Sequence, residues 1–237
     1  MDTASMKQAL ASGLPQLERK LTDAQLDTFC AFGSALVEKN QVMNLTAIIE
    51  PEQVARLHFL DCIALLGAAN FYGKAVIDVG CGAGFPGVPL KIAEPSIDLT
   101  LLDSLKKRMD WLSATLPDLG IEAQCVAARA EEYALAHREQ YDIAVSRAVA
   151  RLTMLAELCL PLVRVGGHFV AMKSADSDEE LSQAARAIAT LGGKVTRIWD
   201  YPVPGTDAVH RAVVITKVKA TPKPYPRRFA KIKQQPL

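Results

Sequence analysis

The sequence predicts an α/β protein whose seven-stranded sheet is mostly parallel, preceded by helices and closed by an antiparallel hairpin. From Lys74 onward, short apolar runs alternate with stretches of helical periodicity, which is typical of parallel strands joined by helical crossovers. A glycine-rich segment directly follows the first of these runs. After Gly193, two apolar runs are separated only by a short loop, and this pattern predicts the hairpin.

Helical patterns fill the residues before the sheet. Apolar side chains recur at helical spacing after Thr22, which can cap a helix that runs through Lys39. A further helix is expected near 4–20, and a proline at the first helical position opens another near 51–68. We therefore expect a helical N-terminal part over residues 1–70 that packs on the core.

The strands and helices of the core follow from the alternating pattern. The expected strands are AVIDVG, IDLTLLD, AQCVAA, YDIAVS and GHFVAMK, followed by the hairpin strands KVTRIWDYPV and HRAVVITKV. The expected helices lie near 87–94, 104–116, 131–139, 151–163 and 177–191. This pattern predicts a core domain over residues 71–218 and leaves a basic, proline-containing tail over residues 219–237.

The composition is that of a globular protein: 50% of the 237 residues are hydrophobic and 22% are charged. The five cysteines are odd in number and none are spaced as Cys-x-x-Cys, while the four histidines are scattered, so we expect neither disulfides nor a metal site. No apolar run approaches the roughly 18 residues of a membrane span. The N-terminus does not resemble a signal peptide. We expect a cytoplasmic monomer without membrane contact.

The charge is unevenly distributed along the chain. The formal net charge is +1, but residues 217–237 contain seven basic residues and no acid, which leaves the preceding body acidic. A basic tail on an acidic body is typical of proteins that bind polyanions, although a solvated terminal extension has the same composition. The segment TPKPYPRRF adds prolines that stiffen the tail and two aromatic side chains that can stack on bases.

The glycine-rich segment VIDVGCGAGFPGVPL indicates a nucleotide site. Gly82, Gly84 and Gly87 match the pattern G-x-G-x-x-G, which occurs in dinucleotide-binding proteins and is weak when it stands alone. A nicotinamide-dependent Rossmann oxidoreductase therefore stays open at this point. The side chains around the glycines help to distinguish a dinucleotide from other nucleotide ligands.

Acidic residues near the glycines favour a ligand without phosphate. Asp78 precedes the run that begins Gly80-Cys81-Gly82 and can order the loop or reach an amine. Asp103 ends the second strand, where a carboxylate accepts hydrogen bonds from a ribose diol. Ala130 and Glu131 follow the third strand, where an adenine edge would lie. S-adenosylmethionine has an amino-acid end, a ribose and an adenine but no phosphate, so the pattern favours this methyl donor over a dinucleotide.

Each candidate side chain also has a structural interpretation. Asp78 can cap loop amides, Phe85 can belong to the core, and Glu131 can be an acid at a helix N-terminus. Arg147, at the end of the fourth strand, can form a salt bridge instead of contacting donor or substrate. Lys173, at the end of the fifth strand, can hold an RNA phosphate or be solvated. His58 is expected to support the helical part against the glycine loop.

Several strings in this chain resemble a known family. They are DVGCGAGFPGVPL, LLDSLKKRMDWL, RAEEY and SRAVARLTMLAELCLPLVRVGG in the core, NQVMNLTAI and RLHFLDCIALL before it, and YPRRFAKIKQQPL in the tail. From about Phe32 to Leu237 the chain resembles the bacterial ribosomal RNA small-subunit methyltransferase G family, also known as glucose-inhibited division protein B. The Phe-Pro-Gly after the glycines and the Ser-Arg-Ala after the fourth strand are the most specific strings.

The resemblance implies a Rossmann-like class I S-adenosylmethionine-dependent methyltransferase. Its implied reaction is methyl transfer to N7 of a guanine in 16S rRNA, guanine 527 of the 530 loop in the usual rRNA numbering, with 16S rRNA or the small ribosomal subunit as partner. The donor contacts that it implies are Gly80, Phe85, Ala130, Glu131 and Arg147. We also expect Asp78, Gly82 and Asp103 to contact the donor, because of their positions around the glycine-rich segment and not because of the resemblance.

The chemistry agrees with this acceptor. N7 of guanine carries a free lone pair at neutral pH, so no catalytic base is required and alignment of the reactants can carry the reaction. We therefore expect no catalytic side chain, with Arg147 and Lys173 as candidate substrate contacts. A non-catalytic RNA-binding protein with a vestigial donor pocket stays open as a further alternative.

Overall fold

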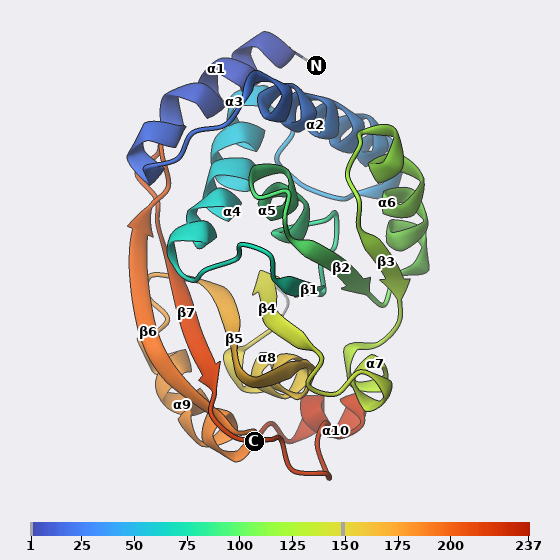
Figure 1. Cartoon of the computed structure of the whole chain (residues 1–237), viewed down its shortest axis with the longest axis vertical. Coiled ribbons are helices and arrows are strands. Elements are labelled where there is room, and N and C mark those ends of the chain that lie inside the picture. The colour runs from blue at the N-terminus through green and yellow to red at the C-terminus, as the bar shows by residue number, and fades with distance from the viewer. Residues whose placement is uncertain (1, 148–149) are drawn as a thin grey trace.

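The computed structural model describes residues 2–147 and 150–237. Its centre is one seven-stranded sheet in the order β3-β2-β1-β4-β5-β7-β6. Five strands are parallel, and the last two form an antiparallel hairpin, as the sequence predicts. Figure 1 shows α1, α2, α5 and α6 on one side of the sheet, and α7, α8, α9 and α10 on the other.

The bounds of the strands agree with the apolar runs. The strands are β1 (Ala75–Val79), β2 (Asp98–Asp103), β3 (Gln124–Ala127), β4 (Tyr141–Arg147), β5 (Val163–Ser174), β6 (Gly193–Pro202) and β7 (Val209–Lys217). The core helices are α5 (Gly87–Ala93), α6 (Lys106–Asp118), α7 (Ala130–Ala136), α8 (Leu152–Cys159) and α9 (Asp178–Thr190). Every crossover therefore contains a helix at the expected place, and β6 follows α9 directly before the hairpin turn.

Helices make up the N-terminal part, as predicted. They are α1 (Thr3–Gly13), α2 (Asp23–Met43) and a broken helix made of α3 (Pro51–Gln53), a π-helical stretch (Val54–Leu60) and α4 (Asp61–Ala64). Thr22 caps α2 in a reciprocal capping box with Gln25. The π-helical stretch carries His58, at the place where this part meets the glycine loop. Wide turns of this kind are rare and often lie at functional sites.

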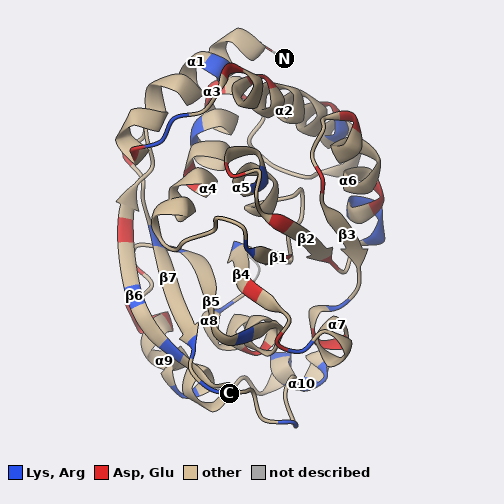
Figure 2. Cartoon of the chain, viewed as in Figure 1, with Lys and Arg blue, Asp and Glu red and all other residues tan. Residues whose placement is uncertain are grey.

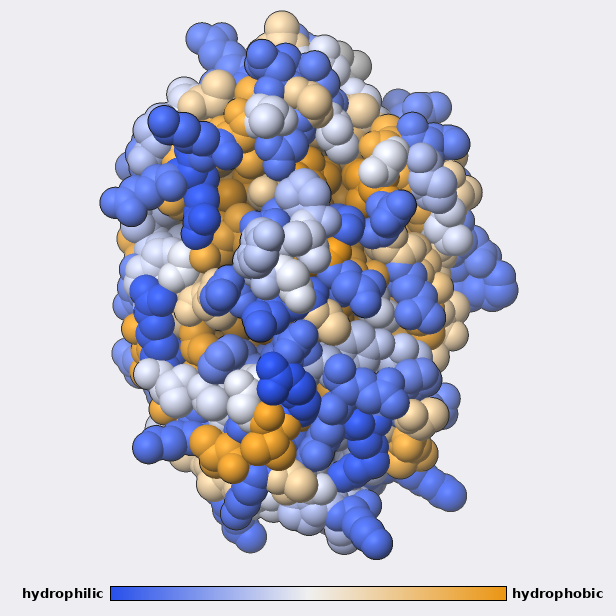
Figure 3. Space-filling view, in the orientation of Figure 1, coloured by the Kyte–Doolittle hydropathy of each residue, from blue (hydrophilic) through white to orange (hydrophobic). Residues whose placement is uncertain are grey.

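The sheet is buried on both faces, which explains the nearly continuous apolar runs of its strands. Along β1, Val76 contributes to a core cluster with the N-terminal helices, α5 and α6, whereas Ile77 contributes to a second cluster with α7, α8 and α9. Phe29, Phe32 and Phe59 of the N-terminal part lie in the first cluster and are fully buried. The hydropathy view shows apolar surface over this half of the molecule, broken up by hydrophilic side chains (Figure 3).

The basic tail packs on the body. Its helix α10 (Phe229–Gln234) contributes the fully buried Ile232 to the second cluster. Arg227 forms an ion pair of 2.6 Å with Glu157 of α8, whose side chain is fully buried. Lys217, at the start of the basic run, is buried and donates to the backbone oxygens of Leu160 and Val163. Arg227, Ile232 and Lys217 are therefore not part of a freely solvated extension.

The remaining tail cations are available at the surface. Lys223, Arg228, Lys231 and Lys233 are exposed. Basic residues also lie along α6, which packs on the other side of the sheet from α10 (Figure 2). The boundaries at residues 70 and 218 stay predictions, since the N-terminal helices share one core with the sheet.

Candidate functional site: a cavity at the carboxyl ends of the strands

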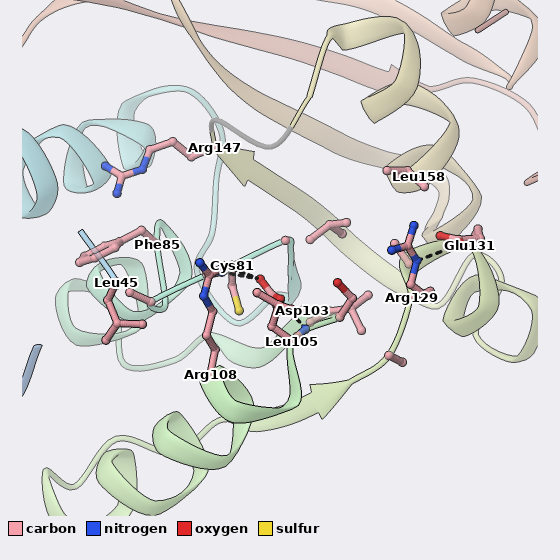
Figure 4. A pocket seen from close by; sticks show the side chains of 18 of the residues that line it. Leu45, Cys81, Phe85, Asp103, Leu105, Arg108, Arg129, Glu131, Arg147 and Leu158 are labelled. Atoms are coloured by element: carbon pink, nitrogen blue, oxygen red, sulfur yellow. Dashed lines mark hydrogen bonds and ion pairs between the residues drawn. The ribbon is translucent and has the colours of Figure 1, made fainter. Parts of the chain in front are cut away.

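A cavity of about 490 Å³ opens beyond the carboxyl ends of β1, β2 and β4. Ligands bind at this edge in open α/β sheets. Seven of the eight predicted donor-binding residues line the cavity: Gly80, Gly82, Phe85, Asp103, Ala130, Glu131 and Arg147. Figure 4 shows that the side chains of Phe85, Asp103, Glu131 and Arg147 come from different elements and surround one space. We call this space the donor cavity.

The glycine loop forms the floor of the donor cavity. Gly82 has a φ of +57°, a left-handed conformation that other residues adopt at a cost. Gly87, at the start of α5, allows a close approach, because a Cβ there would lie 2.9 Å from Oδ2 of Asp78. The loop therefore exposes its backbone to a ligand at Gly80 and Gly82, where no side chain intervenes.

Asp103 holds the glycine loop and faces the cavity. Its Oδ2 accepts a hydrogen bond of 3.0 Å from the backbone N–H of Gly82, and its Oδ1 accepts one of 2.8 Å from Leu105. Nη1 of Arg108 lies 3.7 Å from the same Oδ2. Each carboxylate oxygen has two lone pairs, so both oxygens can still accept a hydrogen bond from a diol.

Asp78 lies beneath the loop and does not line the cavity. Its Oδ2 accepts a hydrogen bond of 2.7 Å from the backbone N–H of Gly87. Its other oxygen has no partner among the described residues. Burial raises the pKa of Asp78 to about 7, although the bond from Gly87 acts in the opposite direction. This geometry supports the structural interpretation of Asp78, and a contact with the donor's amine stays a prediction.

The far end of the cavity is formed by the start of α7 and by the tail. Glu131 is 7% exposed and pairs with Arg129 through an Nε–Oε1 distance of 3.2 Å. The guanidinium of Arg129 lies 3.8 Å from the ring centre of Phe229, which also lines the cavity. Arg129 and Phe229 were not predicted. The only signals were an arginine next to Ala130 and an aromatic residue in the tail.

Phe85 belongs both to the core and to the cavity wall. Its ring is 6% exposed and stacks on His58 with 4.6 Å between ring centres. Phe32 meets it edge-on at 5.9 Å. The guanidinium of Arg147 lies 4.8 Å from the ring centre of Phe85. The ring of Phe85 is therefore a core aromatic and also lines the donor cavity, while its contact with the donor stays a prediction.

Arg147 is fixed by the N-terminal part. It donates to Nδ1 of His58 at 3.2 Å and to the backbone oxygen of Leu57 at 3.4 Å, and it lies 3.5 Å from the carboxylate of Asp61. In the Ser-Arg-Ala string that resembles the family, Arg147 is followed by Ala148, which lies outside the described residues. The arginine therefore forms a salt bridge and lines the cavity at the same time.

His58 joins the helical part to the glycine loop, as expected. Its Nε2 lies 2.8 Å from the hydroxyl of Thr46, while its ring covers Phe85. Burial, with the neighbouring Arg147 as a second cause, lowers the pKa of His58 to about 4. The imidazole is therefore neutral at physiological pH and acts as a packing and hydrogen-bonding group.

Lys173 lies apart from the donor cavity. It lines a second cavity of about 550 Å³, which shares Arg147 and His58 with the first. Its Nζ donates to Oε1 of Glu180 at 2.7 Å and to the backbone oxygen of Ala150 at 2.8 Å. Of the two alternatives for Lys173, the solvated side chain is therefore wrong, and the contact with substrate stays a prediction.

Residues 2–147 and 150–237 also bear on two further classes of site, metal centres and membrane-spanning helices. In these ranges, no group of three or more histidine, cysteine, aspartate or glutamate side chains is arranged to hold a metal ion. The helices in the same ranges do not include one with the length and apolarity that a membrane crossing requires.

Comparisons with known proteins identify the family of this chain. Residues 25–202 match the family model described as rRNA small subunit methyltransferase G. The chain is 44% identical over 236 residues to the ribosomal RNA small subunit methyltransferase G of Alkaliphilus oremlandii, covering 98% of this chain and 99% of the relative. It is 43% identical to the protein of that name from Clostridium botulinum strain Loch Maree, covering 96% and 97%.

A solved structure supports the fold. The precorrin-6y C5,15-methyltransferase of Geobacter metallireducens superposes with a TM-score of 0.50 at 14% identity, covering 74% of this chain and 92% of that one. This likeness concerns the fold alone. On the strength of the family model and of relatives that match almost the whole chain, this protein belongs to the ribosomal RNA small subunit methyltransferase G family.

Proposed function

We propose that this protein transfers the methyl group of S-adenosylmethionine to N7 of a guanine in 16S rRNA, guanine 527 of the 530 loop. The observation that carries the proposal is the donor cavity, which is lined by the glycine loop and by two carboxylates, Asp103 and Glu131. Membership of the methyltransferase family supports the same reaction. The donor supplies an activated methyl group on a sulfonium.

The residues of the cavity match the parts of the donor. Asp103 accepts hydrogen bonds from the ribose diol, and the glycine loop passes beneath the amino-acid end. Ala130 and Glu131 bound the space for the adenine, next to Arg129 and Phe229. These side chains bind and orient the donor.

Catalysis follows from alignment. N7 attacks the methyl carbon with its own lone pair while the carbon–sulfur bond breaks and its electron pair returns to sulfur. No proton moves in this step, so no side chain has to act as a base. Positioning of the reacting atoms supplies several kcal/mol in such reactions. Arg147, at the edge of the donor cavity nearest to the second cavity, fixes the geometry at the point of transfer.

A nicotinamide-dependent oxidoreductase is the alternative among nucleotide-binding enzymes. Asp103, at the end of β2, suits the ribose diol of either cofactor, so membership of the methyltransferase family is what favours the methyl donor. Calorimetry with S-adenosylhomocysteine and with NAD separates the two. Binding of S-adenosylhomocysteine alone is expected, and binding of NAD alone would refute the proposal.

The test of activity is transfer of a labelled methyl group to small subunits isolated from a strain that lacks this modification, followed by mass mapping of the rRNA. Label on one guanine of the 530 loop is expected. Donor binding without transfer to naked rRNA, an assembly intermediate or the mature subunit would favour a non-catalytic RNA-binding protein.

A monomer in the cytoplasm is the proposed form, and light scattering of the protein in solution tests its oligomeric state.

Binding of the RNA is proposed to depend on exposed cations. Lys223, Arg228, Lys231 and Lys233 of the tail remain at the surface after it has packed on α8. Phosphate contacts of this kind weaken steeply with salt, because bound counterions are released. An affinity for the subunit that stays constant between low and moderate salt would contradict this part of the proposal.

A further inference from the structure

The second cavity adjoins the donor cavity and shares Arg147 and His58 with it as lining residues. It lies where β4 and β5 end, and Arg147 is paired in register with Met172 of β5. Apolar surface comes from Ile48, Leu57 and Met172, which line it together with polar side chains. Its volume of about 550 Å³ lies within the range of cavities that hold small ligands.

A fixed donor–acceptor pair faces this cavity. Lys173 and Glu180 are joined by the ion pair described above, and their side chains are 11% and 24% exposed. The backbone N–H of Leu152 also donates to Oε1 of Glu180. Lys173 uses two of its three N–H groups on Ala150 and Glu180, and the third has no partner among residues 2–147 and 150–237. The pair therefore offers an N–H next to a carboxylate at a place fixed by backbone contacts.

The other carboxylate of the cavity is already occupied. Asp61 is 2% exposed, and its Oδ1 accepts hydrogen bonds from the hydroxyl of Tyr201 at 2.9 Å and from Nδ1 of His210 at 2.8 Å. Its Oδ2 faces Arg147. Glu180 differs, because its Oε2 has no partner among the described residues. Glu180 is therefore the carboxylate that can accept hydrogen bonds from a ligand.

We propose, resting on the proposed function, that the second cavity receives the flipped-out target guanine and that Lys173 and Glu180 read its Watson–Crick edge. Enzymes that act on a base commonly extrude it into a pocket where its edge is hydrogen-bonded. Lys173 donates to O6, while Glu180 accepts from N1–H and from the 2-amino group. In this orientation N7, the neighbour of O6, is turned toward the donor cavity.

This arrangement selects guanine and favours its methylation. With N7 toward the donor, adenine would present its 6-amino group to the ammonium of Lys173, which places donors against donors. Methylation leaves a positive charge on the purine, so the hydrogen bonds to the carboxylate of Glu180 strengthen as the transition state forms. Interactions that strengthen in this way accelerate a reaction.

The test compares guanine with inosine at the target position of reconstituted small subunits. Inosine keeps O6, N1–H and N7 but lacks the 2-amino group, so it cannot make the second hydrogen bond to Glu180. We expect the wild-type protein to methylate inosine at least about tenfold more slowly, the usual effect of one hydrogen bond to a charged group. Equal rates with the two bases would overturn the inference without the use of any variant.

The variant Glu180→Gln tests the same contact from the protein side. We expect a lower rate with guanine and a guanine-to-inosine ratio close to one, while the affinity for S-adenosylhomocysteine is unchanged. The control is Glu179→Gln, which changes an exposed acid on the same turn of α9 that does not line the second cavity. An unchanged ratio in Glu180→Gln, or an equal loss in both variants, would overturn the inference.

The failure of the inference is distinguishable from that of the proposed function. If the wild-type protein labels the guanine and Glu180→Gln behaves as wild type, only the assignment of the second cavity is wrong. If the wild-type protein labels no guanine in the 530 loop, the proposed reaction itself is wrong, and the assignment of the cavity is overturned with it.

Discussion

The two cavities that share Arg147 are built in different ways. The donor cavity is formed largely by one continuous loop and by residues that directly follow β2 and β3. Its loop presents backbone, and Asp103 holds this backbone through two hydrogen bonds. The second cavity draws its polar side chains from many elements that lie far apart in the sequence: the π-helical stretch, α4, β4, β5, α9 and β7.

This difference indicates a division of labour. A rigid loop suits a ligand that is the same in every cycle, because its shape is fixed by the backbone. Paired side chains from separate elements suit a base that must be distinguished from other bases. Changes in the donor cavity should therefore alter donor affinity, whereas changes in the second cavity should alter transfer and base preference. Arg147 touches both cavities, and its loss should affect both.

The largest effect is expected for Arg147→Met. Arg147 contacts Phe85, His58 and Asp61, so its removal disturbs the boundary where methyl transfer takes place. We expect the transfer rate to fall about 100-fold or more, as for the loss of a key positioning group, and donor affinity to fall by a smaller factor. Single-turnover transfer and calorimetry measure the two. Arg151→Met is the control, since Arg151 is exposed at the start of α8. If Arg147→Met lowered donor affinity without lowering the transfer rate, Arg147 would belong to the donor cavity alone.

The next largest effect is expected for Asp103→Asn. The amide keeps the size of the side chain but loses the charge, so hydrogen bonds to the ribose diol weaken. We expect donor affinity to fall by about 10- to 100-fold, while the guanine-to-inosine ratio stays as in the wild type. Asp98→Asn, at the exposed start of β2, is the control. If the ratio changed together with the affinity, the two cavities would not be independent.

A smaller effect is expected for Phe229→Leu. This change removes a flat aromatic surface next to Arg129 at the adenine end of the donor cavity. Contacts between aromatic rings contribute about 0.5–1.5 kcal/mol, so donor affinity should fall roughly three- to tenfold. The exposed Lys231 of the same helix, changed to Gln, should leave donor affinity unchanged. Equal affinities of all three proteins would remove the tail from the donor site.

The smallest effect on donor affinity is expected for Asp78→Asn, which instead changes the pH dependence of stability. Asp78 has a pKa of about 7 in the folded protein against an ordinary value of 3.8. The folded state therefore binds more protons than the unfolded state, and the free energy of unfolding falls as pH rises from about 4 through about 7. The amide can still accept from Gly87 but does not ionise.

Denaturant unfolding of the wild type and of Asp78→Asn at several pH values checks this expectation. The difference in unfolding free energy should move in favour of the variant by up to about 4 kcal/mol between pH 4 and pH 8, since each unit of pKa corresponds to about 1.4 kcal/mol. Parallel curves for the two proteins would mean that the carboxyl of Asp78 does not titrate in this range.

The same contrast between the cavities explains how much the sequence could predict. The donor cavity was predicted because Gly80, Gly82 and Asp103 lie at strand ends that recur at regular spacing, so a one-dimensional pattern encodes the site. The parallel strands follow from the same alternation, and the hairpin follows from the place where the alternation stops, whereas the order of the strands in the sheet was seen only in the structure. Apolar runs of strands buried on both faces are the strongest signal that a sequence of this class carries.

The second cavity could not be predicted in this way. Lys173 is singled out by its place at the end of β5, but Glu180 looks like one of several acids in the first turn of a helix. Their pairing arises only when α9 folds back along the sheet. Likewise, Phe229 reaches the donor cavity because a buried ion pair and Ile232 fix the tail, and neither contact leaves a local pattern.

A crystal structure of the protein with S-adenosylhomocysteine and a small-subunit RNA fragment carrying 7-deazaguanine at the target position would test this arrangement most directly. That base cannot be methylated at its missing N7, so the complex is held before transfer. The thioether is expected in the donor cavity with its ribose on Asp103, and the base in the second cavity with its edge on Lys173 and Glu180. A base bound elsewhere, or a donor cavity left empty, would contradict the account.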